Sequence, residues 1–235
     1  MKKVVLAAVA VFAFGVSSAQ DLKFGIKGGV NLATLTGDAA GDDVTAKVGF
    51  HVGGLVEIKF SEKFALQPEL LYSMQGSKAE NSKEADFFSS NSSQTDTKLT
   101  LSYINVPIMV KFYPISGLFV EAGPQVGFLI SANSKEEGSS TVSTITGFDE
   151  EGDPITTTVT TTIDSDEDVK DAYKTLDFGF NFGAGYDFTE NLFVSARYNA
   201  GLSNVSDVSI ANILGNSIEF DAKNSVISLS VGYKF

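Results

Sequence analysis

Long stretches in which apolar and polar residues alternate one by one constrain this chain more than any other feature. Successive side chains of a β-strand point to opposite faces, so strict alternation indicates a strand with one apolar and one polar face. Eight runs of this kind follow one another, at residues 22–32, 48–60, 64–75, 99–112, 118–130, 176–188, 192–202 and 227–235. The sequence therefore predicts an all-β fold of eight strands.

The run at 99–112 changes phase near its middle. Leu99, Leu101 and Tyr103 share one parity, whereas Ile104 and Val106 continue the apolar positions on the other. A β-bulge, which adds one residue to a strand, would restore a single apolar face. We expect such a bulge near Tyr103–Ile104.

The connections between the runs alternate in length. Short turns at 61–63, 114–117 and 189–191 alternate with long polar stretches at 33–46, 77–98, 131–175 and 204–224. Most runs cover about ten residues or more, the length that a tilted strand needs to cross a bilayer. Outer-membrane barrels have short periplasmic turns and long extracellular loops. These features predict an eight-stranded antiparallel up-and-down transmembrane β-barrel.

A soluble up-and-down barrel such as a lipocalin would also show alternation, with its apolar face turned inward. Two features favour the membrane form. The polar face carries charges and many glycines, as expected for the interior of a narrow barrel. The apolar face carries aromatic residues near the strand ends, including Tyr72, Phe112 and Tyr198, and such residues form girdles at membrane interfaces.

The N-terminus has the pattern of an export signal. Lys2 and Lys3 precede the uncharged apolar stretch Val4 to Val16, and small residues end at Ala19. This stretch is shorter than the ~20 residues of a membrane helix. We expect a cleaved signal peptide at 1–19 and a barrel domain at 20–235; the alternative is a short N-terminal anchor helix.

Composition excludes several functions. The chain has no cysteine and a net charge of −12. Disulfides and thiolate metal sites are therefore ruled out, and nucleic acid is not expected as a partner. We expect outer-membrane lipid as the surroundings of the barrel.

Several short motifs resemble one family when taken in order. They are Gln20 to Asn31, Tyr103 to Ile108, Glu121 to Pro124, and Tyr198 to Leu202. Through these motifs, taken together, the mature chain resembles the PorT-like outer-membrane β-barrel family, whose members are often labelled porin-family proteins. The resemblance implies an outer-membrane location and an eight-stranded barrel. It also implies that the barrel-assembly machinery inserts the chain, reading Val231, Tyr233 and Phe235 as a C-terminal signal.

The polar face carries the charged residues that would line the barrel. We expect an interior network of paired charges, because buried charges are tolerated when they are paired and hydrogen-bonded. The alternative is a selectivity ring in a narrow pore. The predicted network comprises Lys27, Glu57, Glu69, Glu121 and Arg197.

Sequence motifs for catalysis or cofactors are weak. His51 is the one histidine, and we interpret it as a hydrogen-bonded interior residue. No serine is marked as a nucleophile. We expect no catalytic residue, no cofactor site and no enzymatic activity.

The stretch at 131–175 is rich in acidic residues. Asp164, Asp166 and Asp168 are a weak candidate for a metal site, but the glycine and glutamate of an EF-hand loop are missing: Val169 and Thr175 stand at those positions. Residues 156–163 have high β propensity. We expect residues 141–146 to pair with them across Gly147–Pro154, forming a protruding hairpin whose edge could bind a partner by strand addition.

These features predict a non-enzymatic outer-membrane barrel that presents acidic extracellular loops for envelope integrity or surface interaction. An extracellular or envelope protein would be the partner of the loops. Two alternatives stay open: a small channel for passive transport, and an accessory component of a protein secretion system, as the resemblance suggests.

Overall fold

The structure is a computed structural model that describes residues 21–37, 44–83, 91–148, 151–207, 209–211, 217–219 and 221–235. The signal peptide predicted at 1–19 lies outside these residues. Within the described part of the chain, no helix is long and apolar enough to cross a membrane.

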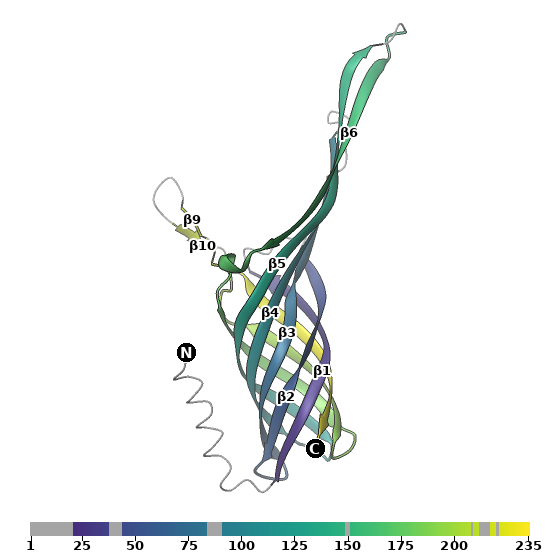
Figure 1. Cartoon of the computed structure of the whole chain (residues 1–235). Coiled ribbons are helices and arrows are strands. Elements are labelled where there is room, and N and C mark those ends of the chain that lie inside the picture. The colour runs from purple at the N-terminus through teal and green to yellow at the C-terminus, as the bar shows by residue number, and fades with distance from the viewer. Residues whose placement is uncertain are drawn as a thin grey trace.

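Eight antiparallel strands close into a barrel (Figure 1). Each strand pairs with its neighbours along the ring, and the ring closes because β1 pairs with β11 and β4 pairs with β5. The predicted fold class is therefore confirmed. The strands of the ring are β1 (Asp21–Thr36), β2 (Val44–Lys59), β3 (Phe64–Lys83), β4 (Asn91–Phe112), β5 (Leu118–Phe148), β7 (Leu176–Asp187), β8 (Leu192–Gly201) and β11 (Lys223–Lys234).

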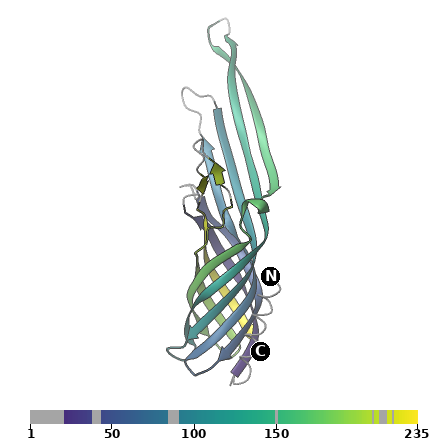
Figure 2. The same cartoon turned by 90° about the vertical axis from the view of Figure 1, so that its left-hand side faces the viewer.

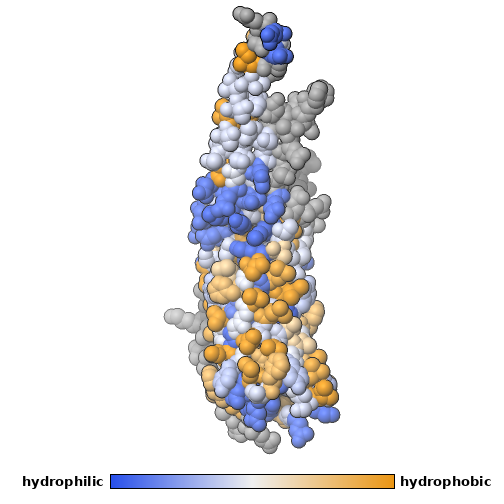
Figure 3. All heavy atoms as spheres, turned by 90° about the vertical axis from the view of Figure 1, so that its right-hand side faces the viewer, coloured by the Kyte–Doolittle hydropathy of each residue, from blue (hydrophilic) through white to orange (hydrophobic). Residues whose placement is uncertain are grey.

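The barrel turns its apolar residues outward. Phe24, Val52 and Leu229 are 57%, 52% and 56% exposed, whereas their chain neighbours on the other face point inward. Figure 3 shows an apolar zone on one face of the barrel, bounded by hydrophilic side chains. Hydrocarbon is the solvent that favours this arrangement, because an outward apolar band next to a polar interior is the pattern of transmembrane barrels.

Strands β3, β4 and β5 continue past the barrel. β6 (Pro154–Asp168) pairs with the upper part of β5, from Asn133↔Asp168 to Phe148↔Pro154, and β4 pairs with β5 as far as Asn91↔Val142. The resulting sheet projects from the end of the barrel opposite the C-terminus (Figures 1 and 2). Residues 141–145 pair with 156–160 as expected, whereas 161–163 pair with 138–140. Most of the region 131–175 is a β-hairpin, not an irregular loop.

Three short elements lie near the same end. They are the 3-10 helix η1 (Lys170–Ala172) and the small hairpin of β9 (Ser209–Ala211) and β10 (Ser217–Glu219). Lys174 donates its backbone N–H to the carbonyl of Val205, and Asp207 donates to Ala172. These bonds tie the segment after β6 to the segment after β8.

The predicted bulge falls at the expected level but on the neighbouring strand. The β4–β5 register shifts between Ser102 and Tyr103, which face Ser131 and Leu129, so the extra residue is Ile130 on β5. β4 itself keeps its phase, and Leu99, Leu101 and Tyr103 point inward. They do so because the lumen, at the end from which the sheet projects, holds an apolar cluster with Leu129 and Ala132. The prediction of one outward apolar face on β4 was therefore wrong.

Candidate functional site

The middle of the barrel holds a buried network of four charged residues from four strands. Arg197 on β8 donates from Nε to Glu121 on β5 at 2.9 Å, and from Nη1 and Nη2 to Glu69 on β3 at 3.1 and 2.9 Å. Lys27 on β1 lies 3.0 Å from Glu69. All four side chains are at most 5% exposed. Two bases thus face two acids, and the group is neutral overall.

Glu57 lies in a second network nearer the barrel end that carries the C-terminus. Its carboxylate accepts bonds from Lys111 at 3.1 Å, from Lys234 at 3.1 and 3.2 Å, and from the Tyr113 hydroxyl at 3.1 Å. Lys234 also binds Asp187 at 3.1 Å. The five predicted interior charges are thus divided between two sites, and the sequence interpretation did not include Lys111, Lys234 and Asp187.

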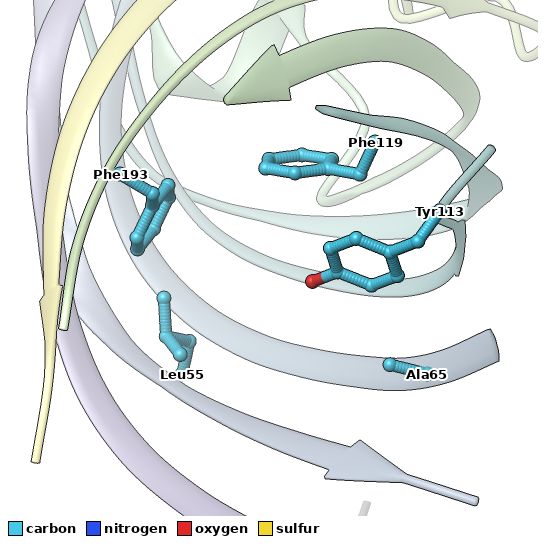
Figure 4. Packing of buried hydrophobic residues seen from close by; sticks show 5 residues of the cluster. All are labelled: Leu55, Ala65, Tyr113, Phe119 and Phe193. Atoms are coloured by element: carbon cyan, nitrogen blue, oxygen red, sulfur yellow. The ribbon is translucent and has the colours of Figure 1, made fainter. Parts of the chain in front are cut away.

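Aromatic rings fill the lumen beside this second network. Phe119 and Phe193 point toward the interior from β5 and β8 and pack with Leu55, Ala65 and Tyr113 (Figure 4). The ammonium group of Lys111 lies 4.0 Å from the centre of the Phe119 ring and 5.0 Å from that of Phe193. This contact is a cation–π interaction.

Two glycines make room for these rings. A Cβ at Gly232 would lie 2.2 Å from the Phe193 ring, and one at Gly185 would lie 2.3 Å from the Phe119 ring. Both distances are far shorter than a carbon–carbon contact of about 3.5–4.0 Å. Gly185 and Gly232 are therefore required by the packing of the aromatic rings in the lumen.

His51 sits in a hydrogen-bonded polar layer above the central network. Its Nδ1 lies 2.8 Å from Asn31 Oδ1 and its Nε2 lies 2.8 Å from Ser230 Oγ. Since an amide oxygen only accepts, Nδ1 donates and Nε2 accepts from the serine hydroxyl. A cavity of about 30 Å³ lies between His51, Lys27 and Arg197, which is room for about one water molecule.

A third polar group lies at the barrel end from which the sheet projects. Asn224 donates to Asp177 at 2.7 Å and to the hydroxyl of Tyr103 at 3.2 Å, and Ser203 donates to Asp177 at 2.8 Å. The apolar cluster of Leu99, Leu101 and Tyr103 lies beside it. Polar and apolar layers therefore follow one another along the lumen.

The acidic residues of the metal candidate lie on β6. Asp164, Asp166 and Asp168 occupy alternate, exposed positions opposite Glu137, Lys135 and Asn133. An extended strand spaces such carboxylates about 7 Å apart and does not wrap them around an ion. In the described residues, no group of three or more His, Cys, Asp or Glu side chains is placed to hold a metal ion.

The residues of the predicted assembly signal lie at the end of β11. Val231, Tyr233 and Phe235 point outward, and the rings of Tyr233 and Phe235 lie 5.7 Å apart. The N–H of Phe235 donates to the carbonyl of Phe24 at 2.8 Å. This bond joins the last residue to β1 and continues the β1–β11 pairing. Recognition of these three residues by the barrel-assembly machinery stays a prediction.

The fold and its layered interior define a small, closed, eight-stranded barrel of the outer-membrane type. The chain belongs to the outer membrane protein beta-barrel domain family, whose model matches residues 18–207. It is therefore an outer-membrane protein. The narrower PorT-like resemblance stays a prediction.

Solved structures with the same kind of fold include three small barrels. Neisserial surface protein A is 15% identical, with 92% of this chain and 100% of that chain covered and a TM-score of 0.46. Ail of Yersinia pestis is 12% identical, with 92% and 100% covered and a TM-score of 0.42. OprG of Pseudomonas aeruginosa is 11% identical, with 91% and 95% covered and a TM-score of 0.40. No curated protein matches the chain.

Proposed function

We propose that this protein is a non-enzymatic, non-conducting barrel that anchors an extracellular β-sheet in the outer membrane and displays it for surface interaction. The observation that carries this proposal is the continuation of β3, β4 and β5 past the barrel, where β6 joins them through a hydrogen-bonded ladder from Asn133 to Phe148. A sheet that continues the barrel wall is held more firmly than a loop, because its backbone bonds extend those of the barrel.

The layered interior supports the non-conducting part of the proposal. The side chains of Lys27, Glu69, Glu121 and Arg197 meet across the lumen, and the rings of Phe119 and Phe193 lie below them. An eight-stranded barrel has an interior just wide enough for its side chains. A continuous aqueous path would require these ion pairs to separate, so we favour the closed barrel over the channel.

The composition of the sheet supports the display. Both faces of the β5–β6 hairpin carry Ser, Thr and acidic side chains that are exposed or partly exposed. Such a polar surface is stable in contact with water and remains accessible to other molecules. The accessory role in secretion is a separate prediction, which co-purification of a stable envelope complex would test.

Labelling in intact cells tests the display. Because the chain has no cysteine, a single Thr160→Cys variant gives a clean site on β6, and Glu62→Cys gives the matched site in a short turn. A membrane-impermeant maleimide should label T160C in intact cells and E62C only after the envelope is opened. The reverse pattern would contradict the proposed orientation.

Planar bilayers test the closed lumen. The purified chain should give no discrete conductance steps at moderate voltage. Regular steps from a protein that is folded by heat-shift electrophoresis would favour the channel.

A further inference from the structure

Strand β6 has an edge that no described strand covers. It pairs with β5 along its whole length and with no other strand of the described chain. The β5–β6 register is unbroken from Asn133↔Asp168 to Ile145↔Thr156. The Val169 N–H donates to the Ala132 carbonyl at 2.9 Å, and these two residues form the next pair of the same register, so this pair is a hydrogen-bonded one. Since hydrogen-bonded pairs alternate in an antiparallel ladder, Thr157, Val159 and Thr161 bond to β5.

The intervening residues therefore direct their backbone groups away from β5. These residues are Thr156, Thr158, Thr160 and Thr162, whose side chains are all exposed. Their N–H and C=O groups form a template for another strand.

Between Pro154 and Asp164 this edge lacks the usual protection. Natural sheets guard their edges with charges, prolines or bulges. The segment Ile155–Ile163 contains no charged residue, no glycine and no proline, and its charges begin at Asp164. Threonine, valine and isoleucine are also the residues that favour strands.

The segment Ile155–Ile163 is a palindrome. It reads Ile-Thr-Thr-Thr-Val-Thr-Thr-Thr-Ile in both directions. Two copies aligned antiparallel about Val159 therefore place Val159 against Val159 and every other residue against one of its own kind. Threonine pairs across strands are already present in this hairpin, since Thr141 and Thr160 are hydrogen-bonded at 3.2 Å. Cross-strand pairs of this type stabilise sheets.

Charge selects the direction of pairing. In the antiparallel alignment Asp164 faces Pro154, and Asp166 and Asp168 extend beyond the paired segment. In a parallel alignment in register, the same acids of two copies would lie side by side, and like charges directly opposite each other are destabilising. The sequence of β6 is compatible with an antiparallel copy and opposes a parallel one.

We propose that β6 binds the β6 edge of a second copy of this chain, antiparallel and centred on Val159. This inference rests on the proposed display function and names the partner. β6 runs from the tip of the hairpin back toward the barrel (Figure 2), so antiparallel pairing places the two barrels at opposite ends. The two copies belong to two facing membranes, and the contact holds cells together.

The paired segment of each β6–β6 contact is short, so firm attachment requires many such contacts. Val159 lies nine residues from Asp168, which corresponds to about 30 Å along an extended strand. One nine-residue pair is a small interface, but many copies on two facing surfaces raise the overall avidity by about 10²–10⁴.

Register-specific crosslinking tests the pairing. The full mature chain is reconstituted in two vesicle populations, one labelled with a donor and the other with an acceptor dye. In the antiparallel alignment Val159→Cys should crosslink to itself between vesicles, because position 159 is a non-hydrogen-bonded pair with close Cβ atoms. Thr157→Cys should crosslink to Thr161→Cys but not to itself. Crosslinks of T157C to itself would show parallel pairing and overturn the proposal.

A backbone variant tests the edge. Thr158→Pro removes an N–H that points away from β5, so the β5–β6 ladder stays intact. It should lower vesicle clustering, measured by energy transfer, by about tenfold or more because avidity is lost. The matched Thr158→Ala variant keeps the N–H and should cluster like the parent chain. Equal clustering of T158P and the parent would contradict the proposal.

The two proposals can fail separately. If T160C is labelled in intact cells but the parent chain causes no clustering and V159C forms no crosslink, the display stands and the second copy is not its partner. If T160C is not labelled, the display itself is wrong.

Discussion

The barrel interior and the sheet that projects from the barrel share strands β3, β4 and β5 but hold their charges in opposite ways. Inside, Arg197 and Glu69 lie 2.9 Å apart and are at most 5% exposed. Outside, Lys98 and Glu137 lie 3.0 Å apart and are 39% and 43% exposed. The distances are nearly the same, and the surroundings differ.

Burial, not distance, therefore determines how much the loss of one partner of an ion pair costs in stability here. A charge in a dry interior cannot be left without a partner, because the desolvation cost is then uncompensated. An exposed pair exchanges its contacts with water and contributes little. Loss of one interior partner should therefore damage the barrel, whereas loss of an exterior partner should not.

The largest effect is expected at Glu57. Glu57→Ala leaves Lys111 and Lys234 in the lumen without their shared carboxylate. The expected loss is about 4–5 kcal/mol of unfolding free energy, measured by urea unfolding in lipid vesicles. In Asp187→Ala, Glu57 still pairs with both Lys234 and Lys111, so this change should cost less. If Glu57→Ala were as stable as the parent chain, the contrast between interior and exterior ion pairs would be wrong.

A slightly smaller effect is expected at Arg197. Arg197→Met leaves Glu69 and Glu121 without the guanidinium, but Lys27 still lies 3.0 Å from Glu69. The expected loss is about 3 kcal/mol, from the same unfolding measurement. Arg197→Lys keeps the charge without the two-pronged geometry and should fall between. Conductance should stay absent; a conducting variant of full stability would indicate a selectivity ring.

The period-two pattern was enough to predict the eight strands, the three tight turns and the inward direction of Lys27, Glu69, Glu121 and Arg197. The pattern could not show how far along the barrel axis each side chain lies. Parity places Glu57, Lys111 and Lys234 inside, but only the register between strands shows that these three meet nearer the barrel end that carries the C-terminus. Register in a tilted barrel depends on pairings between distant segments.

The phase change near Tyr103 shows a second limit. The pattern located an irregularity, but it could not say which strand carries the extra residue. A bulge on β5 leaves Leu99 and Tyr103 inside, because the lumen there is apolar. On β5 the inward positions pass from Leu129 to Ala132, which only the register between the strands reveals.

An intermediate effect is expected where packing rather than charge fills the lumen. Gly232→Ala places a methyl group 2.2 Å from the Phe193 ring, so the ring must move. Overpacking of this kind costs about 1–3 kcal/mol, again measured by urea unfolding. Gly152→Ala is the matched exterior change, since nothing lies within 4 Å of its Cβ position. Its positive φ of 87° adds only local strain at the tip, so barrel unfolding should not change.

The smallest effect is expected at the exterior ion pairs, where pH gives the sharpest measurement. Hydrogen bonds from Lys135 and Lys98, together with their positive charges, lower the pKa of Glu137 from 4.5 to about 2. A lowered pKa means that the folded hairpin favours the charged form. The contribution is therefore fully present above pH 4.5 and is lost as the pH falls through about 2.

Carboxyl NMR titration of Glu137 in the folded chain tests this last point. Lys135→Ala should raise the pKa of Glu137 toward its ordinary value, and high salt should do the same because exposed charges are screened. Barrel unfolding should stay unchanged in both cases, since the hairpin opens to water without exposing the lumen. If unfolding of the barrel instead weakened with the titration of Glu137, the extracellular sheet would share the stability of the interior, and the contrast between the two regions would be wrong.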